Sequence, residues 1–446
     1  MNKRDFLKHA TLFSIGGLIL PSSILSSCRE ESLFEDINYQ GKVLIIGAGA
    51  AGLYAGYLLQ AKGIDFTILE ASNTHGGRLG KLSGFADYDL DTGAQWLHGR
   101  NSILGDLAQQ TNTEISIDNS ELKYWFKGEI KSSLPKDPFI FENDNLSDIS
   151  FLAYAEQQGF DNDYANIIEA LAGDQGADAS LLSAYWNYKD EENWISGDED
   201  YKFAKSFYDL IHENIAKSII GNIQYNSPVS HIDYTQEQIQ VRDSFGNFYL
   251  ADKLIITVPI SILKLEEITF NPALPNEKTA AFSKIGMGPG MKVFLKFSAK
   301  FYEENLYGGD ICAAYVDESE GKPGNDHVLL AFVMGHQAAY LSSLGSDSAI
   351  TNALLNELDA IYGGQASSLF IASSVHDYTN KDFIKGAYSY SSIGMGNARE
   401  IAAQPINNSL FFAGEAMNTN GHHQTVHGAV ESGYKAVMDL FKGIEK

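Results

Sequence analysis

One short segment near the N-terminus constrains the fold of this chain more than any other feature. An apolar run at Lys42–Ile46 is followed at once by the pattern Gly47-Ala-Gly-Ala-Ala-Gly52 and by a helix-forming stretch to about Lys62. A second apolar run, Asp65–Leu69, ends at Glu70. Strand, glycine turn, helix, second strand and terminal acid in this order are typical of a βαβ unit that binds a dinucleotide. The segment therefore predicts an α/β fold with a Rossmann-like domain.

Each residue type in this unit has a physical role. Gly47 permits a tight turn, Gly49 lets the backbone approach a pyrophosphate, and Gly52 lets the helix pack closely on the strand. The first turn of the helix, with Ala51, presents N–H groups and the positive end of the helix dipole to phosphate. Glu70 can accept hydrogen bonds from both ribose hydroxyls of an adenosine. This unit alone does not distinguish FAD from NAD.

Further motifs follow in a fixed order over residues 41–440. The chain reads Glu70-Ala71 and then Gly76-Gly77-Arg78, Asp91-Thr-Gly93-Ala94-Gln95-Trp96-Leu-His98-Gly99, Pro228-Val229, Thr257-Val-Pro259, Gly414-Glu415 and Thr425-Val426-His-Gly-Ala429. Together these motifs resemble the flavin-containing amine oxidase family. The closest motifs are those of polyamine and spermine oxidases and of the catalytic domains of lysine-specific histone demethylases.

The resemblance implies FAD as cofactor. It also implies hydride transfer from the carbon next to an amine nitrogen to flavin N5, hydrolysis of the imine, and reoxidation by O2 to give H2O2. By the same resemblance, the cofactor-binding residues are Gly47, Gly49, Ala51, Gly52, Glu70, Ala71, Gly77, Arg78, Gly93, Ala94, Gln95, Trp96, Val229, Pro259, Tyr378, Gly414, Glu415, Thr425 and Val426. The family usually has an arginine at the position of Ser72, so one cofactor contact is lost or replaced. Ala387 stands where monoamine oxidases carry a flavin-linking cysteine, which implies non-covalent FAD.

Four residues are implied to act on the substrate. Lys292 begins an alternating segment typical of a strand, and the family's lysine there holds a water beside flavin N5. Tyr388 corresponds to one wall of an aromatic cage for the amine, and Thr425 to the second, non-aromatic wall. His98 matches the histidine of animal-type polyamine and spermine oxidases.

The substrate class stays open at this stage. His98, Thr425 and the acid-rich insertion at residues 116–221 favour a polyamine or an aliphatic monoamine over an aromatic amine. An L-amino acid is the main alternative, although Arg100, Arg242 and Arg399 do not obviously supply a partner for its carboxylate. A flavin desaturase or isomerase on the same scaffold is another alternative.

Charge and cysteine content narrow the set of partners. The formal net charge is −25, which disfavours nucleic acid and attracts cations such as an amine. The two cysteines, Cys28 and Cys312, show no disulfide or zinc pattern, and no metal site is expected. We expect Cys312 to be a buried apolar residue.

The first 28 residues have the pattern of an export signal. Basic residues precede an apolar run from Ala10 to Leu20, and Leu25-Ser-Ser-Cys28 resembles a bacterial lipobox. The resemblance implies cleavage before Cys28, lipidation of Cys28, and a membrane-anchored lipoprotein in the periplasm or cell envelope. Lys3-Arg-Asp-Phe-Leu-Lys8 also resembles a twin-arginine export motif, so the export route is left open. Residues 29–40 are expected to be a polar tether.

The order of motifs predicts two interwoven domains. The FAD-binding domain is expected to be discontinuous, and the two insertions are expected to form an α+β substrate-binding domain. The predicted segments are 41–115, 222–298 and 390–446 for the first domain, and 116–221 and 299–389 for the second.

Overall fold

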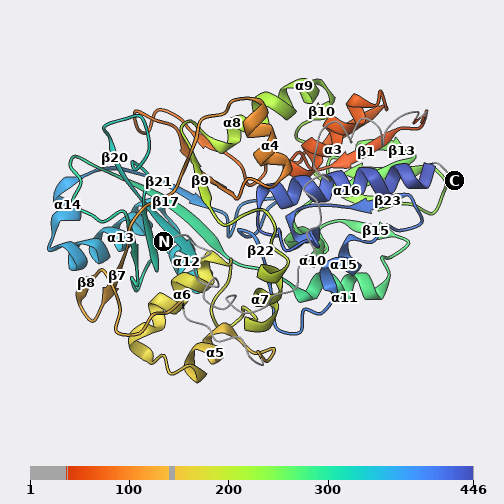
Figure 1. Cartoon of the computed structure of the whole chain (residues 1–446). Helices are drawn as coiled ribbons and strands as arrows, with labels where there is room; N and C mark the ends of the chain where they lie inside the picture. The colour runs from red at the N-terminus through yellow and green to blue at the C-terminus, as the bar shows by residue number, and fades with distance from the viewer. Residues whose placement is uncertain (1–36, 38, 140–145, 445–446) are drawn as a thin grey trace.

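In the computed structural model, which describes residues 37, 39–139 and 146–444, the glycine-rich segment directly follows the central strand of a parallel sheet (Figure 1). The strand order is β10 (Ile223–Gln224), β2 (Phe66–Leu69), β1 (Val43–Ile46), β14 (Lys253–Ile256) and β23 (Leu410–Phe412). Between β1 and β2 the chain forms helix α3 (Ala50–Ala61). The predicted strand, turn, helix and second strand are therefore confirmed.

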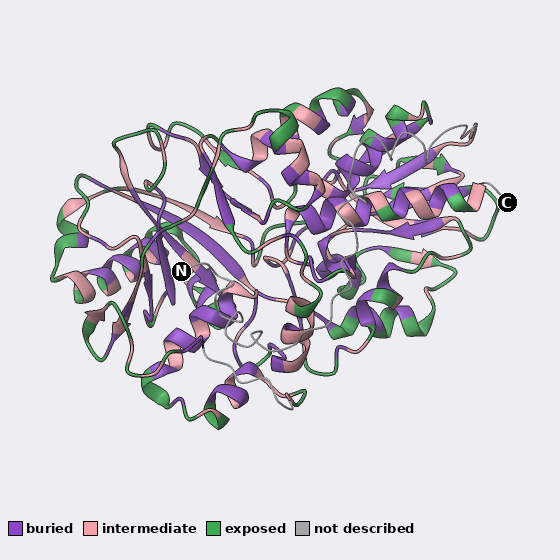
Figure 2. Cartoon of the chain, in the orientation of Figure 1, coloured by how far each residue is buried: buried purple, intermediate pink, exposed green. Residues whose placement is uncertain are grey.

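Both faces of this sheet are covered, which explains why its strands are continuously apolar. Val43 and Ile45 pack in one core with α3 and the long helix α16 (Val426–Ile444). Leu44 and Ile46 pack in a second core against α10 (Ile260–Lys264), α11 (Asn276–Lys284) and α15 (Ala398–Ala403). Figure 2 shows the buried residues concentrated on the strands and on the inner faces of these helices.

A seven-stranded sheet forms the other half of the molecule (Figure 1). Its order is β21 (Phe370–Asp377), β17 (Gly290–Phe297), β20 (His327–Met334), β19 (Ala314–Asp317), β18 (Asn305–Tyr307), β7 (Leu122–Phe126) and β8 (Glu129–Lys131). Strand pairing thus places β17 with this sheet, although its residues fall in the segment 222–298 assigned by sequence to the FAD-binding domain. Every residue of β17 pairs with β20, and seven of its eight also pair with β21. No local sequence motif specifies this pairing between strands that are distant in the chain.

Helices cover the seven-stranded sheet. One core packs α12 (Gly335–Ser343), α13 (Asp347–Tyr362) and α14 (Gln365–Leu369) against β17 and β20, and it contains the fully buried Cys312 as expected. A second core packs α5 (Phe151–Gln157) and α6 (Ala165–Asp174) against β7 and β18. Cys28 and the rest of the predicted signal lie outside the described residues.

In the described part of the chain, four smaller sheets and several short helices complete the fold. The smaller sheets are β13 (Phe248–Ala251), β12 (Ile239–Asp243), β11 (Val229–Asp233) and β15 (Thr269–Asn271); β5 (Trp96–His98), β9 (Asp200–Phe203) and β6 (Ile115–Ile117); β16 (Ile285–Met287) with β22 (Ser389–Ser391); and β3 (Lys81–Leu82) with β4 (Leu90–Asp91). The remaining helices are α4 (Ile103–Gln110), α7 (Ala184–Glu192), α8 (Phe207–Ile211), α9 (Lys217–Ile219) and a π-helical turn at His212–Ala216.

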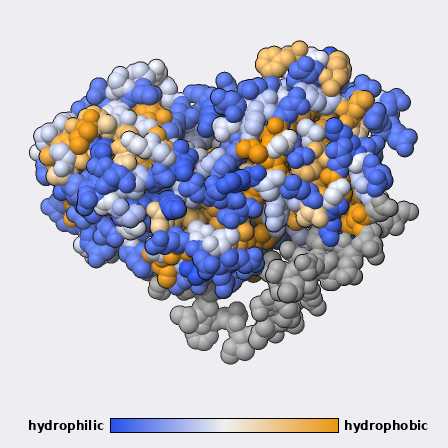
Figure 3. All heavy atoms as spheres, turned by 90° about the horizontal axis from the view of Figure 1, so that it is seen from above, coloured by the Kyte–Doolittle hydropathy of each residue, from blue (hydrophilic) through white to orange (hydrophobic). Residues whose placement is uncertain are grey.

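The outer surface is largely hydrophilic in the view from above (Figure 3), with small apolar areas scattered over it. Within the part of the chain that the structure describes, no helix combines the length and the apolar character needed to cross a membrane.

Candidate active site

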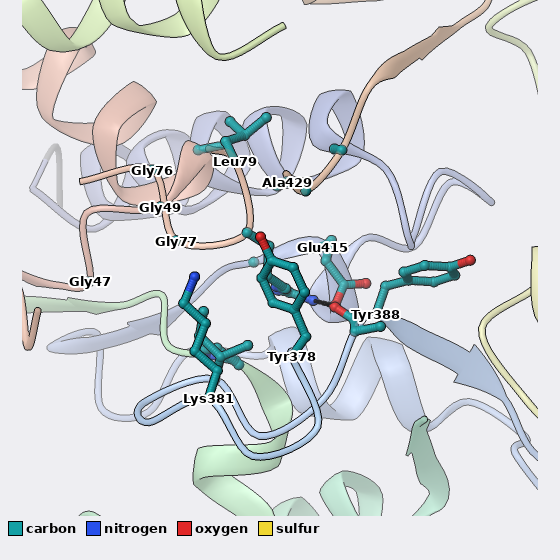
Figure 4. A pocket seen from close by; sticks show the side chains of 18 of the residues that line it. Gly47, Gly49, Gly76, Gly77, Leu79, Tyr378, Lys381, Tyr388, Glu415 and Ala429 are labelled. Atoms are coloured by element: carbon teal, nitrogen blue, oxygen red, sulfur yellow. Dashed lines mark hydrogen bonds and ion pairs between the residues drawn. The ribbon is translucent and has the colours of Figure 1, made fainter. Parts of the chain in front are cut away.

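A cavity of about 900 Å³ runs between the two large sheets, and Figure 4 shows the residues around it. It lies at the carboxyl ends of β1 and β14, where parallel α/β sheets bind their ligands. Its volume is near the upper end of the range for small-molecule and cofactor sites. The cavity lining includes almost all of the residues named from sequence, with Gly52 as the exception.

The glycine turn forms one edge of the cavity without side chains. A methyl group added to Gly49 would meet no atom within 4 Å, so its backbone faces open space. Gly52 instead lies behind the turn, where an added methyl would come within 2.0 Å of the Gly47 carbonyl oxygen. Gly52 is therefore needed for close packing of α3, as its position in the motif predicts, and it does not line the cavity.

Glu70 closes the far end of this edge. One carboxylate oxygen accepts a hydrogen bond from the Ala48 amide at 2.7 Å. The other accepts from the amide and hydroxyl of Ser72 at 2.9 and 2.7 Å. Ser72 thus steadies the acid that is expected to hold the ribose.

The partly buried Arg78 and the buried Glu415 form an ion pair on the cavity wall. The Arg78 guanidinium lies 2.8 Å from the Glu415 carboxylate and also donates to the Ala387 carbonyl at 2.9 Å. The second Glu415 oxygen accepts from the Ser389 hydroxyl and the Gln424 amide. Burial alone would raise the pKa of Glu415, but Arg78 and Ser389 outweigh it, so that pKa lies below its ordinary value. Glu415 is therefore a fixed negative charge.

Thr425 begins helix α16 at the same wall. Its hydroxyl accepts from the Gly428 amide at 2.9 Å and donates to the His422 carbonyl at 2.7 Å. This is the hydrogen bonding of an N-cap residue, so the hydroxyl is engaged in starting the helix. Thr425 lines the cavity as predicted, but its hydroxyl holds the helix rather than a ligand. The first amides of α16 face the cavity with the positive end of the helix dipole.

Lys292 is buried on β17 and directed into the cavity. Its ammonium donates to the Asp91 carbonyl at 2.9 Å and to the side-chain oxygen of Gln95. The Gln95 amide in turn donates to Glu318 at 2.6 Å. Strand alternation accounts for this direction, since residues next to Lys292 in sequence face the opposite core. The lysine is thus held by a backbone carbonyl and by a side-chain amide oxygen.

Tyr378 and Tyr388, which Figure 4 labels, and His98 are further predicted residues that line the cavity. Tyr388 donates its phenol to the Gly173 carbonyl at 2.9 Å, and burial raises its pKa well above the ordinary value. The Tyr378 phenol lies against Gly93, where an added methyl would approach it to 3.1 Å. His98 Nδ1 lies 2.6 Å from Asp200, which fixes the imidazole on the substrate side.

Comparison with known proteins agrees with this geometry. Residues 128–440 match the model of the flavin-containing amine oxidoreductase family, and residues 45–111 match an NAD(P)-binding Rossmann-like domain. The chain belongs to the flavin-containing amine oxidoreductases. The resemblance inferred from the motifs is thereby confirmed.

Individual members of the family are distant in sequence. Human lysine-specific histone demethylase 2 is 27% identical over 95% of this chain and 56% of its own length. Probable polyamine oxidase 4 of Arabidopsis thaliana is 26% identical over 93% of this chain and 90% of its own length. Among solved structures, cyclohexylamine oxidase from Brevibacterium oxydans superimposes with a TM-score of 0.76 at 18% identity, over 92% of this chain and 100% of that one. The chain spans about a third to a little over half of the demethylases that it matches.

The cavity fits the FAD of this family. The side-chain-free edge at Gly49 leaves room for a pyrophosphate, Glu70 stands at the ribose end, and the α16 amides can face a flavin ring. Bound there, FAD supplies a two-electron acceptor. No side chain at Ala387 offers a nucleophile for covalent attachment.

Sequence reasoning missed several residues of the cavity. His376 and Lys381 flank Tyr378 on the strand and loop that carry it, and Trp194, Phe332 and Met334 come from the substrate side. His376 could have been found from the period-2 alternation that places it on the same face as Tyr378. Lys381 lies in a loop, where no periodic signal exists.

Proposed function

We propose that this chain is an FAD-dependent oxidase of an aliphatic amine, with a polyamine as the favoured substrate. One observation carries the proposal: the Lys292 ammonium is fixed between Asp91 and Gln95 inside the same cavity as the glycine turn and Tyr388. A buried ammonium fixed in this way can hold a water or a product oxygen next to the cofactor. The proposed overall reaction removes a hydride from the carbon next to nitrogen, hydrolyses the imine, and returns electrons to O2 as H2O2.

The walls of the cavity favour a cationic substrate. Asp174 and Glu191 line it, and the His98–Asp200 pair lies at its edge. The Tyr388 ring offers a π face, which attracts an ammonium group. More than one acid in the cavity lining is what a substrate with more than one ammonium group would need.

The arginines argue against an L-amino acid. Arg100 stacks over the Tyr201 ring at 4.4 Å, and Arg399 is buried and donates to Ser389 and Ala416. Neither residue lines the cavity, and Arg78 is paired with Glu415. A flavin desaturase or isomerase is also disfavoured, because such a reaction does not need the water or product oxygen that Lys292 is proposed to hold.

The test is anaerobic reduction of the purified yellow protein. We expect spermidine or putrescine to bleach the flavin band, a simple monoamine to bleach it more slowly, and L-amino acids to leave it unchanged. Production of H2O2 on admission of air is the second readout. Purified protein that takes up no flavin from excess FAD would refute the proposal, and rapid bleaching by an L-amino acid alone would refute the substrate class.

We further propose that the chain is exported and anchored through lipidated Cys28. The motif Leu25-Ser-Ser-Cys28 supports this, and it lies outside the described residues. The wild-type protein should partition into detergent in a Triton X-114 extraction, whereas Cys28→Ser should stay in the aqueous phase. Cys312→Ser is the matched control, and equal partitioning of wild type and Cys28→Ser would contradict the anchor.

A further inference from the structure

The pyrophosphate edge of the cavity has little free positive charge. Ser72 donates its hydroxyl to Glu70 and to the Thr74 carbonyl, so it strengthens an acid instead of supplying a cation. Arg78 is shared with Glu415 at 2.8 Å. The N-terminus of α3 contributes about half a unit charge, which does not balance a pyrophosphate. A further cation from another part of the fold would stabilise the phosphates.

The loop after Tyr378 is fastened to this edge of the sheet. The Ser261 hydroxyl in α10 donates to the Ile384 carbonyl, and the Ile384 amide donates to the Lys381 carbonyl at 3.1 Å. Helix α10 directly follows β14, and Thr257 at the end of β14 donates to the carbonyls of Ile46 and Gly47 at 2.8 and 3.1 Å. A short series of hydrogen bonds thus ties the Lys381 loop to the glycine turn.

The Lys381 side chain is available for a ligand. It is exposed within the cavity lining, and its ammonium rests 4.6 Å from the centre of the Tyr378 ring. Across residues 39–139 and 146–444, no carboxylate forms an ion pair with it, and the adjacent Asp382 pairs with Lys385 at 3.1 Å. Figure 4 shows the side chain extending from its loop toward Gly47 of the glycine turn and toward Gly77.

We propose that Lys381 binds the pyrophosphate of the cofactor, opposite the N-terminus of α3, and supplies the charge that Ser72 does not. The inference rests on the proposed use of FAD. A lysine on a loop can move from the Tyr378 ring to a phosphate by rotating side-chain torsions alone. The pair of phosphates is held between a helix end on one side and an ammonium on the other.

The experiment measures cofactor affinity and does not depend on turnover. Deflavinated wild-type protein, Lys381→Met and Lys385→Met are titrated with FAD, with riboflavin, and with ADP as a competitor, and binding is followed by flavin fluorescence. Lys381→Met should weaken FAD and ADP by about 10- to 100-fold, as loss of a charged hydrogen bond does, and leave riboflavin unchanged. Lys385→Met removes a lysine of the same loop and should bind all three like wild type. Lys381→Arg should recover most of the affinity for FAD.

Two results would overturn the inference. Equal weakening of riboflavin and FAD would place Lys381 at the ring rather than at the phosphates. Unchanged affinity for FAD and ADP in Lys381→Met would remove its role altogether. If the wild-type protein binds no FAD, the proposed function itself is refuted. If the wild type and Lys381→Met bind FAD equally well, only the role of Lys381 is refuted.

Discussion

His376 and Lys292 face each other across the pairing of β17 and β21. Both residues line the cavity, and the His376 ring lies edge-on to Phe294. Burial, with the charges of Lys292 and Lys381, lowers the pKa of His376 to about 4. At neutral pH the imidazole is therefore uncharged, and it adds a polar, neutral group beside a buried ammonium.

This neutral histidine predicts a defined loss of stability in acid. The unfolded chain protonates His376 below pH 6.5, whereas the folded protein resists protonation down to about pH 4. Its contribution is present above pH 6.5 and is lost as the pH falls through that window, with at most about 3 kcal/mol involved. His376→Gln should lose less unfolding free energy than wild type between about pH 7 and pH 4.5 in urea titrations. His231→Gln, on β11, is the control, and identical pH profiles for wild type and His376→Gln would contradict the prediction.

The ammonium of Lys292 is expected to act on the water or oxygen next to the flavin. Lys292→Met keeps the shape of the side chain but removes the donor that Asp91 and Gln95 bind. We expect flavin content to be unchanged and the rate of reoxidation or turnover to fall by about 100-fold, a typical effect for one positioned proton-handling group. Stopped-flow spectroscopy separates the two half-reactions. Lys296→Met is the matched control, because Lys296 lies on the same face but pairs with Asp326; wild-type rates in Lys292→Met would eliminate the assigned role.

Single residues of the site were predictable where they belong to a contiguous motif. Gly49, Glu70 and Glu415 lie next to turns and strand ends whose chemistry is local, and all three line the cavity. His376 and Lys381 were missed because their positions depend on which strands pair and where a loop is fastened. Those facts depend on contacts between distant segments, which local patterns do not carry.

At the scale of elements, helices α3 and α16 pack closely against each other in the FAD-binding half. A methyl added to Gly433 would come within 2.4 Å of the Ala51 carbonyl oxygen, so the two helices meet through a glycine. The same helices begin at the two ends of the cofactor cavity, at Gly49 and Thr425. Their packing therefore sets the distance between the phosphate edge and the flavin edge.

Gly433→Ala should force these helices apart. We expect a loss of about 1–3 kcal/mol of unfolding free energy, as overpacking of a tight contact produces, together with weaker FAD binding. Thermal or urea unfolding of the apoprotein and a flavin titration are the measurements. Gly221→Ala, at a site where an added methyl meets nothing within 4 Å, should be close to neutral. Equal stability of both variants and wild type would show that the helices can adjust without cost.

The elements themselves were partly predictable. β1, α3 and β2 were identified from the alternation of apolar runs and glycine. The strand order of the seven-stranded sheet was not predictable, because β7 and β8 belong to a segment far earlier in the chain than β17. Nothing in the short apolar runs specifies such partners.

At the scale of the whole molecule, the net charge of −25 acts over the entire surface. A doubly or triply charged polyamine should be drawn toward the protein at low ionic strength, and salt should screen that attraction. We expect kcat/KM for a polyamine to fall by about 10-fold between about 20 and 500 mM salt, while kcat changes little. A singly charged amine should show a weaker dependence, and an equal slope for both substrates would contradict electrostatic attraction.

The two edges of the cavity come from opposite ends of the chain. During translation, Gly47 leaves the ribosome early, whereas Glu415 and Thr425 emerge only after nearly all other residues have been made. A nascent polypeptide therefore carries half of a nucleotide site for most of its synthesis. Stable capture of the flavin has to wait until β23 has joined the sheet, which makes cofactor loading a step that follows the synthesis of both segments.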